Sequence, residues 1–318
     1  MSNQEFAPKI LVLGANGFLG KNVSQVLNNH NDYEIIESHG KKSMDLKNYN
    51  ELDNFLQKNQ VDYVINCAAF VGGIAFGYDY PAELIRENTL ITGNLYEACY
   101  QNNVKSLINP ISNCAYPEDE FLFEEKNFLK GPPHESVFEY GMSRRFSVAC
   151  GKAYFNEHGF TSTNVVLSNM FGPFDHFEEK RSHALGALIK KIHKAKEENL
   201  DKVTIWGTGK PIREWLFVRD GANALIKSIS LENNHYFFNV GVNKGMTIIE
   251  MAKKIAKLYE WNGEFEFNTN KPDGAMEKRV LSSKSVKLLD WSPEVNFDDG
   301  LIETIEWYKK NLNANENK

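Results

Sequence analysis

Short apolar runs alternate with longer amphipathic stretches along the first half of the chain. Between the apolar runs lie helical stretches, notably 81–102 and 136–158. Five continuous apolar runs have the length of strands buried on both faces: KILVLG (9–14), DYEIIE (32–37), VDYVINCAA (61–69), SLINPIS (106–112) and TNVVLSN (163–169). Alternation at this spacing is typical of βαβ units. The pattern therefore predicts an α/β fold with a Rossmann-type, doubly wound parallel sheet.

The alternation of apolar runs and amphipathic stretches becomes less regular after residue 170. A helix is expected over 182–198, an extended segment over VTIWGTG (203–209), and another helix from Asp220. The string TIIE (247–250) forms a capping box that opens a helix to about Tyr259. No Pro/Gly/Ser linker separates the halves. We expect a large domain over 1–169, rejoined by about 214–242, and a smaller C-terminal α/β lobe over 170–213 and 243–318 that binds substrate.

Composition and charge narrow the class of protein. The 318 residues carry a net charge of −6, which argues against a general nucleic-acid binder. No apolar run is long enough to span a bilayer, and the N-terminus lacks a basic region leading into an apolar signal core. The four cysteines show no CxxC or CxxH spacing. We expect a cytoplasmic protein with reduced thiols, no metal site and no partner among nucleic acids or membranes.

A glycine-rich loop follows the first predicted strand and opens a helix. It reads GANGFLG, with Asn16, Phe18 and Leu19 between Gly14, Gly17 and Gly20. In such a loop the first glycine permits a tight turn, the second lets the backbone approach a pyrophosphate, and the third lets the helix pack close to the strand. Glycine-rich turns also occur for packing alone, but the strand–loop–helix context predicts a dinucleotide site. The large domain is therefore expected to bind the cofactor.

The end of the second predicted strand bears on the choice between NAD and NADP. The string ESHGKK offers Glu37, which could accept from the adenosine ribose, and then His39, Lys41 and Lys42, which could bind an extra phosphate. The lysines could also belong to a solvated loop. Because Glu37 lies one or two residues before the strand tip, we favour NADP(H) and keep NAD as the alternative.

Three side chains suggest a carbonyl reductase. Ser112 ends the strand 106–112, where open α/β sheets place their chemistry, and Tyr140 and Arg144 lie one turn apart on the following helix. Tyrosine can protonate a developing alkoxide while serine holds the oxygen. Lowering a tyrosine pKa from about 10 to about 7 takes roughly 4 kcal/mol, and a positive charge about 4 Å away supplies roughly that amount at an effective dielectric of about 20. Arg144 carries such a charge, although Tyr140 and Arg144 could also be mere helical neighbours.

Longer segments resemble the extended short-chain dehydrogenase/reductase family, in particular its GDP-L-fucose synthase branch. The match covers nearly the whole chain, through GANGFLG, AAFVGGI (68–74), SNCAYP (112–117), SNMFGPFDHF (168–177), SHALGALIKKIH (182–193), WGTGKPIREWLFV (206–218), NVG (239–241) and KPDG (271–274). The resemblance implies an NADP(H)-dependent 4-ketoreductase of a GDP-linked 4-keto sugar. It also implies epimerisation at carbons 3 and 5, a role in GDP-sugar biosynthesis for surface polysaccharide, and a homodimer that pairs the two long helices.

The resemblance also assigns residues. Ser112 and Tyr140 take the reductase roles, with Arg144 where the family has lysine. Cys114 and His183 match the pair that moves protons beside the ketone, and a thiol and an imidazole suit that task. Arg213 matches the family's pyrophosphate arginine and Asn169 its asparagine beside the sugar, and Ala68 and Ala69 are expected at the cofactor. Further candidates for the substrate are Lys191, Lys278 and Trp206, although the lysines could equally belong to a solvated face.

The chain departs from the family pattern at three places. Arg144 replaces the motif lysine, Phe70 replaces a lysine near the sugar, and AMEKRVLSS follows KPDG where the family has a string like TPRKLLD. The last two departures bear on the sugar, and a GDP-linked heptose is one expectation. Two alternatives stay open: an NAD-dependent dehydrogenase or epimerase of another nucleotide sugar, and a cofactor-binding protein in which Arg144 has removed catalysis.

Overall fold

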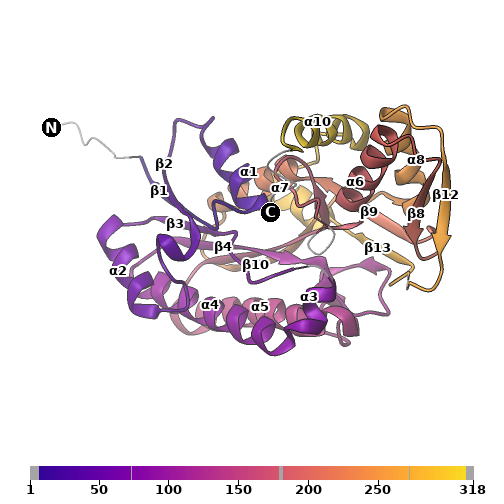
Figure 1. Cartoon of the computed structure of the whole chain (residues 1–318). Helices are drawn as coiled ribbons and strands as arrows, with labels where there is room; N and C mark the ends of the chain where they lie inside the picture. Colours follow the sequence, from indigo (N-terminus) through magenta and orange to yellow (C-terminus); the bar gives the residue numbers. More distant parts are fainter. Residues whose placement is uncertain (1–6, 73, 179–181, 272, 313–318) are drawn as a thin grey trace.

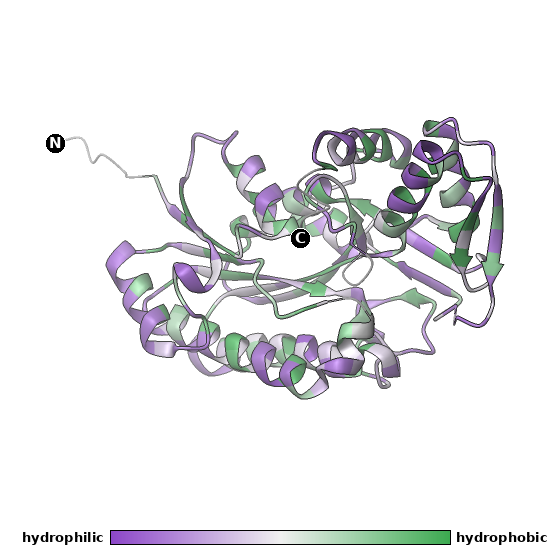
Figure 2. Cartoon of the chain, in the orientation of Figure 1, coloured by the Kyte–Doolittle hydropathy of each residue, from purple (hydrophilic) through white to green (hydrophobic). Residues whose placement is uncertain are grey.

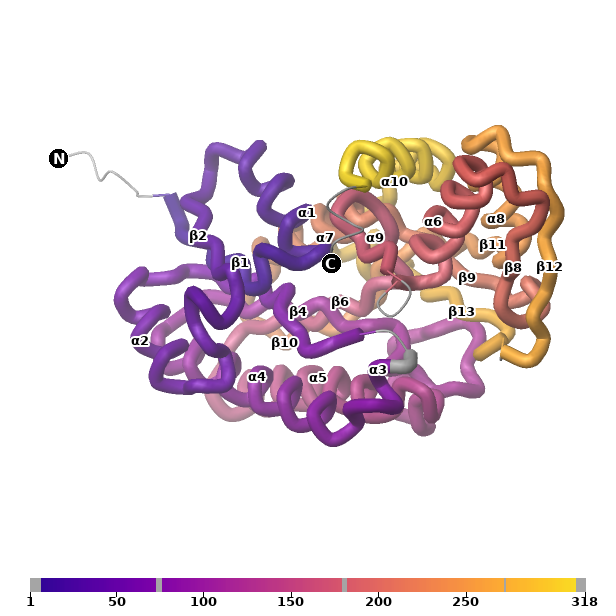
Figure 3. Tube along the Cα trace, viewed as in Figure 1, coloured from indigo at the N-terminus to yellow at the C-terminus, as the bar shows by residue number. Residues whose placement is uncertain are grey.

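The computed structural model describes residues 7–72, 74–178, 182–271 and 273–312. Gly73 of the AAFVGGI segment and Pro272 of KPDG lie outside these ranges, as do the first six residues of the chain. Two lobes lie side by side, the larger carrying the N-terminal half and the smaller most of the C-terminal half (Figure 1). The tube in Figure 3 follows the same path, with the chain passing between the lobes several times.

A six-stranded parallel sheet forms the centre of the large lobe, as predicted. Its strand order is β10-β6-β4-β3-β1-β2. The strands are β1 (Lys9–Leu13), β2 (Glu34–Ser38), β3 (Tyr63–Asn66), β4 (Ser106–Ser112), β6 (Ser162–Leu167) and β10 (His235–Val240). The five predicted apolar runs supply β1, β2, β3, β4 and β6. The last run was predicted as one strand over 163–169. This prediction was wrong at its end, because β6 stops at Leu167 and Asn169 begins a separate strand, β7 (Asn169–Phe171).

Helices cover both faces of this sheet, which makes it doubly wound. Helices α4 and α5 pack against each other on one face, and α1 and α7 pack together on the other (Figure 1). The helices of this lobe are α1 (Phe18–Leu27), α2 (Tyr49–Asn59), α3 (Ile74–Asp79), α4 (Pro81–Gln101), α5 (Phe138–His158), α7 (Val218–Lys227) and α9 (Ser283–Leu289). Apolar residues gather on the strands and on the helix faces turned toward them (Figure 2), which is why the predicted periodicities match these elements.

The small lobe has two short sheets. One has the order β11-β9-β13-β5 with β7 paired to β9, and the other pairs β12 with β8. Its strands and helices are β5 (Leu122–Phe123), β8 (Lys202–Trp206), β9 (Ile212–Phe217), β11 (Gly245–Thr247), β12 (Glu264–Asn268), β13 (Glu277–Val280), α6 (Ala184–Glu197), α8 (Ile248–Leu258) and α10 (Phe297–Lys310). The predicted capping box is present at the start of α8, where Thr247 and Glu250 bond each other's backbone amides.

The predicted domain boundaries remain an interpretation of the sequence. Strand β5 comes from the first 169 residues but pairs with β13 in the small lobe, and β9 runs across the predicted boundary at residue 213. Among the described helices, none combines the length and the apolar character needed to cross a membrane.

Candidate active site

The carboxyl end of β4 leads directly into the predicted catalytic residues. Ser112 is its last residue, and a 3₁₀ turn, η2 (Asn113–Ala115), follows. The Ser112 hydroxyl oxygen accepts a hydrogen bond from the Cys114 backbone N–H at 3.3 Å. The first turn of α5 packs on this segment so closely that a Cβ on Gly141 would lie 3.3 Å from the Cys114 carbonyl oxygen. The fold therefore brings Ser112 and Cys114 next to the start of α5, which carries Tyr140.

Tyr140 and Arg144 are in direct contact. The Arg144 guanidinium carbon lies 5.1 Å from the centroid of the Tyr140 ring. Arg144 is only 4% exposed, and its Nη2 donates to Asn88 Oδ1 on α4 at 2.9 Å. Its Nε is buried and has no hydrogen-bond partner in the part of the chain that the structure describes. A buried guanidinium N–H without a protein acceptor fits a ligand oxygen, such as a ribose hydroxyl, beside Tyr140.

The charge argument for Tyr140 needs correction. Burial raises the pKa of Tyr140 above its usual value, and the Arg144 charge opposes this rise without overcoming it. Our expectation that Arg144 alone lowers this pKa to about 7 was therefore wrong for the protein without ligands. It left out the desolvation of the phenol, which only the folded structure reveals. Tyr140 is consequently protonated at neutral pH, as a proton donor must be.

Cys114 and His183 come from different lobes. Burial raises the pKa of the Cys114 thiol, and Ser112, Lys278 and Arg144 partly offset this rise. His183 is the N-cap residue of α6, and surrounding protein together with His176 lowers the pKa of its imidazole, although the ring is accessible to solvent. No hydrogen bond in the described ranges links His183 to Ser112 or Tyr140. At neutral pH the pair provides one proton donor, the thiol, and one proton acceptor, the neutral imidazole.

The glycine loop has the geometry of a phosphate-binding turn. Gly14 has φ +72°, and a Cβ there would lie 2.8 Å from the Ala68 backbone nitrogen. A Cβ on Gly20 would lie 2.2 Å from the Gly14 carbonyl oxygen, so only glycine lets α1 approach β1 this closely. Gly17 is the exposed N-cap of α1, which begins at Phe18 and continues through Leu19. The amides of the first helical turn thus point out of an exposed N-terminus, where an anion binds favourably.

The residues expected at the adenosine end lie beside this loop. His39 follows β2, and its Nδ1 lies 3.1 Å from Asn16 Oδ1. The His39 Nε2 lies 3.5 Å from the Glu37 carboxylate, so Glu37 is engaged with His39. Lys41 follows in the exposed 3₁₀ turn η1 (Gly40–Lys42). Ala69 and Ala68 follow β3 on the other side of Gly14.

Two cations predicted for the substrate come together on neighbouring strands. Lys278 on β13 is in register with Arg213 on β9. Burial lowers the pKa of Lys278, Cys114 raises it and Arg213 lowers it, so the thiol and the guanidinium are both near the ammonium group. Asn169 on β7 donates its side-chain N–H to the Glu214 carbonyl oxygen at 3.0 Å. Lys278 and Arg213 therefore place two positive charges on neighbouring strands, close to Cys114.

Trp206 and Lys191 lie farther along the small lobe. Trp206 ends β8 and is 52% exposed. The Lys191 ammonium donates to the Thr204 carbonyl oxygen at 3.0 Å and lies 5.4 Å from the Trp206 ring centroid, while the Lys271 ammonium lies 5.3 Å from it. The structure therefore ties Lys191 to Trp206 and not to Arg213, although both lysines could face a ligand on the indole.

Two positioning residues were missed from the sequence. Asn88 on α4 is fully buried, and it exchanges hydrogen bonds with both backbone groups of Phe70 while accepting from Arg144. Arg145 is 8% exposed and donates through Nε to the Ala115 carbonyl oxygen at 2.7 Å, which fixes the Cys114 turn to α5. The available signal was weak: an asparagine on the apolar face of a helix, and a second arginine after Arg144.

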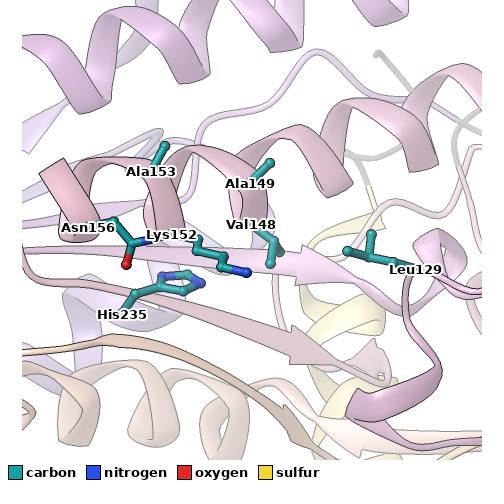
Figure 4. A pocket seen from close by; sticks show the side chains of 7 residues that line it. All are labelled: Leu129, Val148, Ala149, Lys152, Ala153, Asn156 and His235. Carbon is teal, nitrogen blue, oxygen red and sulfur yellow. The ribbon is translucent and has the colours of Figure 1, made fainter.

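A pocket of about 350 Å³ lies elsewhere, along α5 and β10 (Figure 4). Its wall includes His235, whose pKa burial lowers to about 4 with help from Lys284 and Lys152. The pocket is lined by Leu129, Val148, Ala149, Lys152, Ala153, Asn156 and His235. None of these seven belongs to the predicted catalytic set, and the chemistry of Ser112 and Tyr140 is at the other end of α5.

Comparisons with known proteins agree with this arrangement. Residues 10–241 match the NAD dependent epimerase/dehydratase family. The chain is 32% identical to an Arabidopsis thaliana protein named putative GDP-L-fucose synthase 2, over 97% of this chain and 94% of that protein. It is similar to the crystal structure of a GDP-L-fucose synthetase from Naegleria fowleri bound to NADP, with a TM-score of 0.86, 27% identity, and 96% and 94% of the two chains covered.

A second solved structure extends the comparison to heptoses. It is a GDP-6-OMe-4-keto-L-xylo-heptose reductase from C. jejuni, with a TM-score of 0.85, 25% identity, and 95% and 98% of the two chains covered. The resemblance to extended short-chain dehydrogenases/reductases of the GDP-L-fucose synthase type is thus confirmed, as is the Rossmann-type fold. The chain belongs to the NAD dependent epimerase/dehydratase family.

Proposed function

We propose that this protein is an NADPH-dependent reductase of a GDP-linked 4-keto sugar, a 6-deoxyhexose or a heptose, which also epimerises carbons 3 and 5. The observation that carries the proposal is the cluster of Ser112, Cys114, Tyr140 and Arg144 where β4 meets α5. Relatives that reduce or synthesise GDP-sugars, at 25–32% identity over nearly the full chain, support it.

The residues present fit NADP(H). Gly14, Gly17 and Gly20 shape an exposed helix N-terminus for a pyrophosphate, and the partnerless Arg144 Nε suits a ribose hydroxyl. We assign the 2′-phosphate of NADP(H) to His39 and Lys41. The nearby Glu37 carboxylate is already engaged with His39, so we do not assign it to the adenosine ribose. The NADP-bound relative supports this choice over NAD. When bound, NADPH supplies the hydride that reduces carbon 4.

Tyr140 and Ser112 handle the oxygen of the ketone. The Ser112 hydroxyl holds this oxygen, and the protonated Tyr140 donates its proton as negative charge develops there. Arg144 stabilises the tyrosinate left behind, because its guanidinium lies against the Tyr140 ring. Since this charge is in place, the structure favours a catalytic protein over a cofactor-binding protein that has lost activity.

Cys114 and His183 exchange protons at the neighbouring carbons. The ketone at carbon 4 acidifies the C–H bonds at carbons 3 and 5. A neutral His183 can remove a proton, and a protonated Cys114 thiol can deliver one from the other lobe. Arg213 and Lys278 bind the diphosphate, Asn169 lies beside the sugar, and Trp206 with Lys191 takes the nucleoside.

The proposal includes a homodimer in the cytoplasm, serving surface polysaccharide synthesis. Apolar side chains remain exposed on α4 and α5, among them Leu90 at 45%, Phe138 at 38% and Phe146 at 40%. Pairing these helices between two copies would cover them. Light scattering should show a dimer, and Phe146→Glu should shift it toward monomer. A wild-type monomer would contradict this part of the proposal.

All four cysteines are free thiols, which suits the reducing compartment that the proposal assumes.

Product NMR tests the reaction. Purified protein is incubated with GDP-4-keto-6-deoxymannose or a GDP-4-keto-heptose, and with NADPH or NADH. We expect a 4-hydroxy product with NADPH from at least one sugar. Oxidation of neither cofactor with either sugar would refute the proposal, and faster reaction with NADH would overturn the cofactor choice. Tyr140→Phe is the matched control, since it removes a single hydroxyl.

A further inference from the structure

Two loops of the small lobe are joined by one carboxylate. The loop after β8 contains Gly207 and Thr208, and the loop before β13 contains Asp273. The Thr208 backbone N–H donates to Asp273 Oδ1 at 2.6 Å, and its hydroxyl donates to Asp273 Oδ2 at 2.8 Å. Both carboxylate oxygens of Asp273 thus hold Thr208, which belongs to the other loop.

The backbone is shaped for this contact. Gly207 has φ +72°, and a Cβ there would lie 2.1 Å from Asp273 Oδ1. Any side chain at position 207 would therefore displace the carboxylate. The Thr208 hydroxyl also accepts from the Lys210 backbone N–H at 3.3 Å, which fixes the turn toward β9.

The two loops carry the groups assigned to the nucleotide. Trp206 lies two residues before Thr208 and Lys271 two residues before Asp273, and the lysine ammonium is 5.3 Å from the centroid of the indole ring. Arg213 Nη2 donates to the Asp273 carbonyl oxygen at 3.4 Å, and Nη1 donates to the Ile212 carbonyl oxygen at 2.8 Å. The negative charge of Asp273 also favours the charged form of Arg213, opposing the burial that lowers its pKa.

We propose that Asp273 is a positioning residue for the nucleoside diphosphate. Through Thr208 it fixes the loop that presents Trp206, and through its own backbone it orients the guanidinium of Arg213. Both carboxylate oxygens of Asp273 accept hydrogen bonds from Thr208. Asp273 therefore acts through this loop and not by contact with the substrate. This inference rests on the proposed function, because the ligand is the GDP part of that substrate. Binding to a preformed site avoids ordering the two loops, so releasing them should weaken GDP binding without slowing hydride transfer.

Calorimetry with GDP alone, together with steady-state kinetics, tests the idea. Asp273→Ala removes both hydrogen bonds, and we expect the Kd for GDP and the KM for the GDP-sugar to rise at least about tenfold. The kcat should stay within about twofold, and the Kd for NADPH should not change. Asp273→Asn keeps an acceptor for the Thr208 amide and should fall between wild type and Asp273→Ala.

Two further variants separate positioning from general damage. Asp201→Ala removes an exposed carboxylate at the other end of β8 and should match wild type. Thr208→Val removes the hydroxyl, with its bonds to Asp273 and to the Lys210 backbone N–H, but keeps the backbone N–H bond to Asp273. It should raise the GDP Kd by less than Asp273→Ala does. If kcat or the affinity for NADPH in Asp273→Ala fell by the same factor as KM rose, Asp273 would have a general structural role. That result would overturn its proposed role in positioning the nucleoside diphosphate.

The outcomes distinguish the two proposals. Equal GDP affinity in wild type and Asp273→Ala overturns the role of Asp273 and leaves the proposed reaction intact. GDP affinity that falls in Asp273→Ala, in a protein that turns over no GDP-4-keto sugar, supports the role of Asp273 and overturns the reaction. A wild-type protein that does not bind GDP overturns both.

Discussion

Removing the charge of Arg144 should make Tyr140 a weaker acid. The guanidinium carbon lies 5.1 Å from the Tyr140 ring centroid, and two unit charges at that distance interact by roughly 3 kcal/mol at an effective dielectric of about 20. Arg144→Met keeps an apolar stem of similar length but no charge. It should therefore raise the pKa of Tyr140, adding to the rise that burial already causes.

The sign of the effect shows in the pH dependence of turnover. Reduction needs Tyr140 protonated, so turnover falls as pH rises through the Tyr140 pKa. In Arg144→Met this alkaline limb should move to higher pH, and kcat at pH 7.5 should fall by about tenfold or more, because a weaker acid transfers its proton less readily. Measurements use saturating NADPH, since the loss of the Arg144 N–H groups should also weaken cofactor binding.

Arg144→Lys separates charge from shape. It restores the common motif and keeps the charge, so kcat should stay within about tenfold of wild type and the alkaline limb should move less than it does in Arg144→Met. Tyr140→Phe should abolish the limb and lower turnover by about 10²–10⁴. An alkaline limb that stays in place in Arg144→Met would refute the electrostatic role of Arg144. Full activity in Tyr140→Phe would refute the catalytic assignment itself.

Three further outcomes are expected. NADPH should bind more tightly than NADH, and Lys41→Ala should narrow the gap; equal affinities in wild type would contradict the 2′-phosphate site. In deuterated water the product should carry deuterium at carbons 3 and 5, and Cys114→Ala or His183→Ala should suppress it; a wild-type product without deuterium would mean reduction alone. Burial raises the pKa of Asp175 from 3.8 to about 7, so the folded protein keeps a proton that the unfolded chain releases. The free energy of unfolding should therefore fall as pH rises across that interval, and Asp175→Asn should flatten this slope in denaturant titrations; an unchanged slope would contradict the shift.

The large sheet was predictable because its strands are buried on both faces. Each of β1, β3 and β4 is a continuous apolar run that no amphipathic helix would produce. Strand β10, HYFFNV, was not recognised, since only its last three residues are buried and it lies at the edge of the sheet. The short strands of the small lobe were mostly missed for another reason: β13 has four residues and β5 has two, which are too few to show a periodicity.

Motifs in the sequence nominated the candidate site residues, but they did not indicate how these side chains are held. Motifs indicated Tyr140 and Arg144, yet the partner of Arg144 is Asn88, 56 residues away on another helix. Nothing local to either residue encodes that pairing. The raised pKa of Tyr140 depends on burial by several elements, which a charge estimate from helical spacing cannot include.

The buried arginines of the site donate their hydrogen bonds to neutral oxygens, which is compatible with diphosphate binding by an acidic protein. Arg144 donates to an amide oxygen, and Arg145 and Arg213 donate to backbone carbonyls. In the described part of the chain, none of these three forms an ion pair, whereas surface cations such as Lys105 and Lys254 pair with carboxylates. Neutral acceptors satisfy N–H groups without cancelling charge, so the positive potential remains for a ligand. The net charge of −6 therefore says little about the local potential at these arginines.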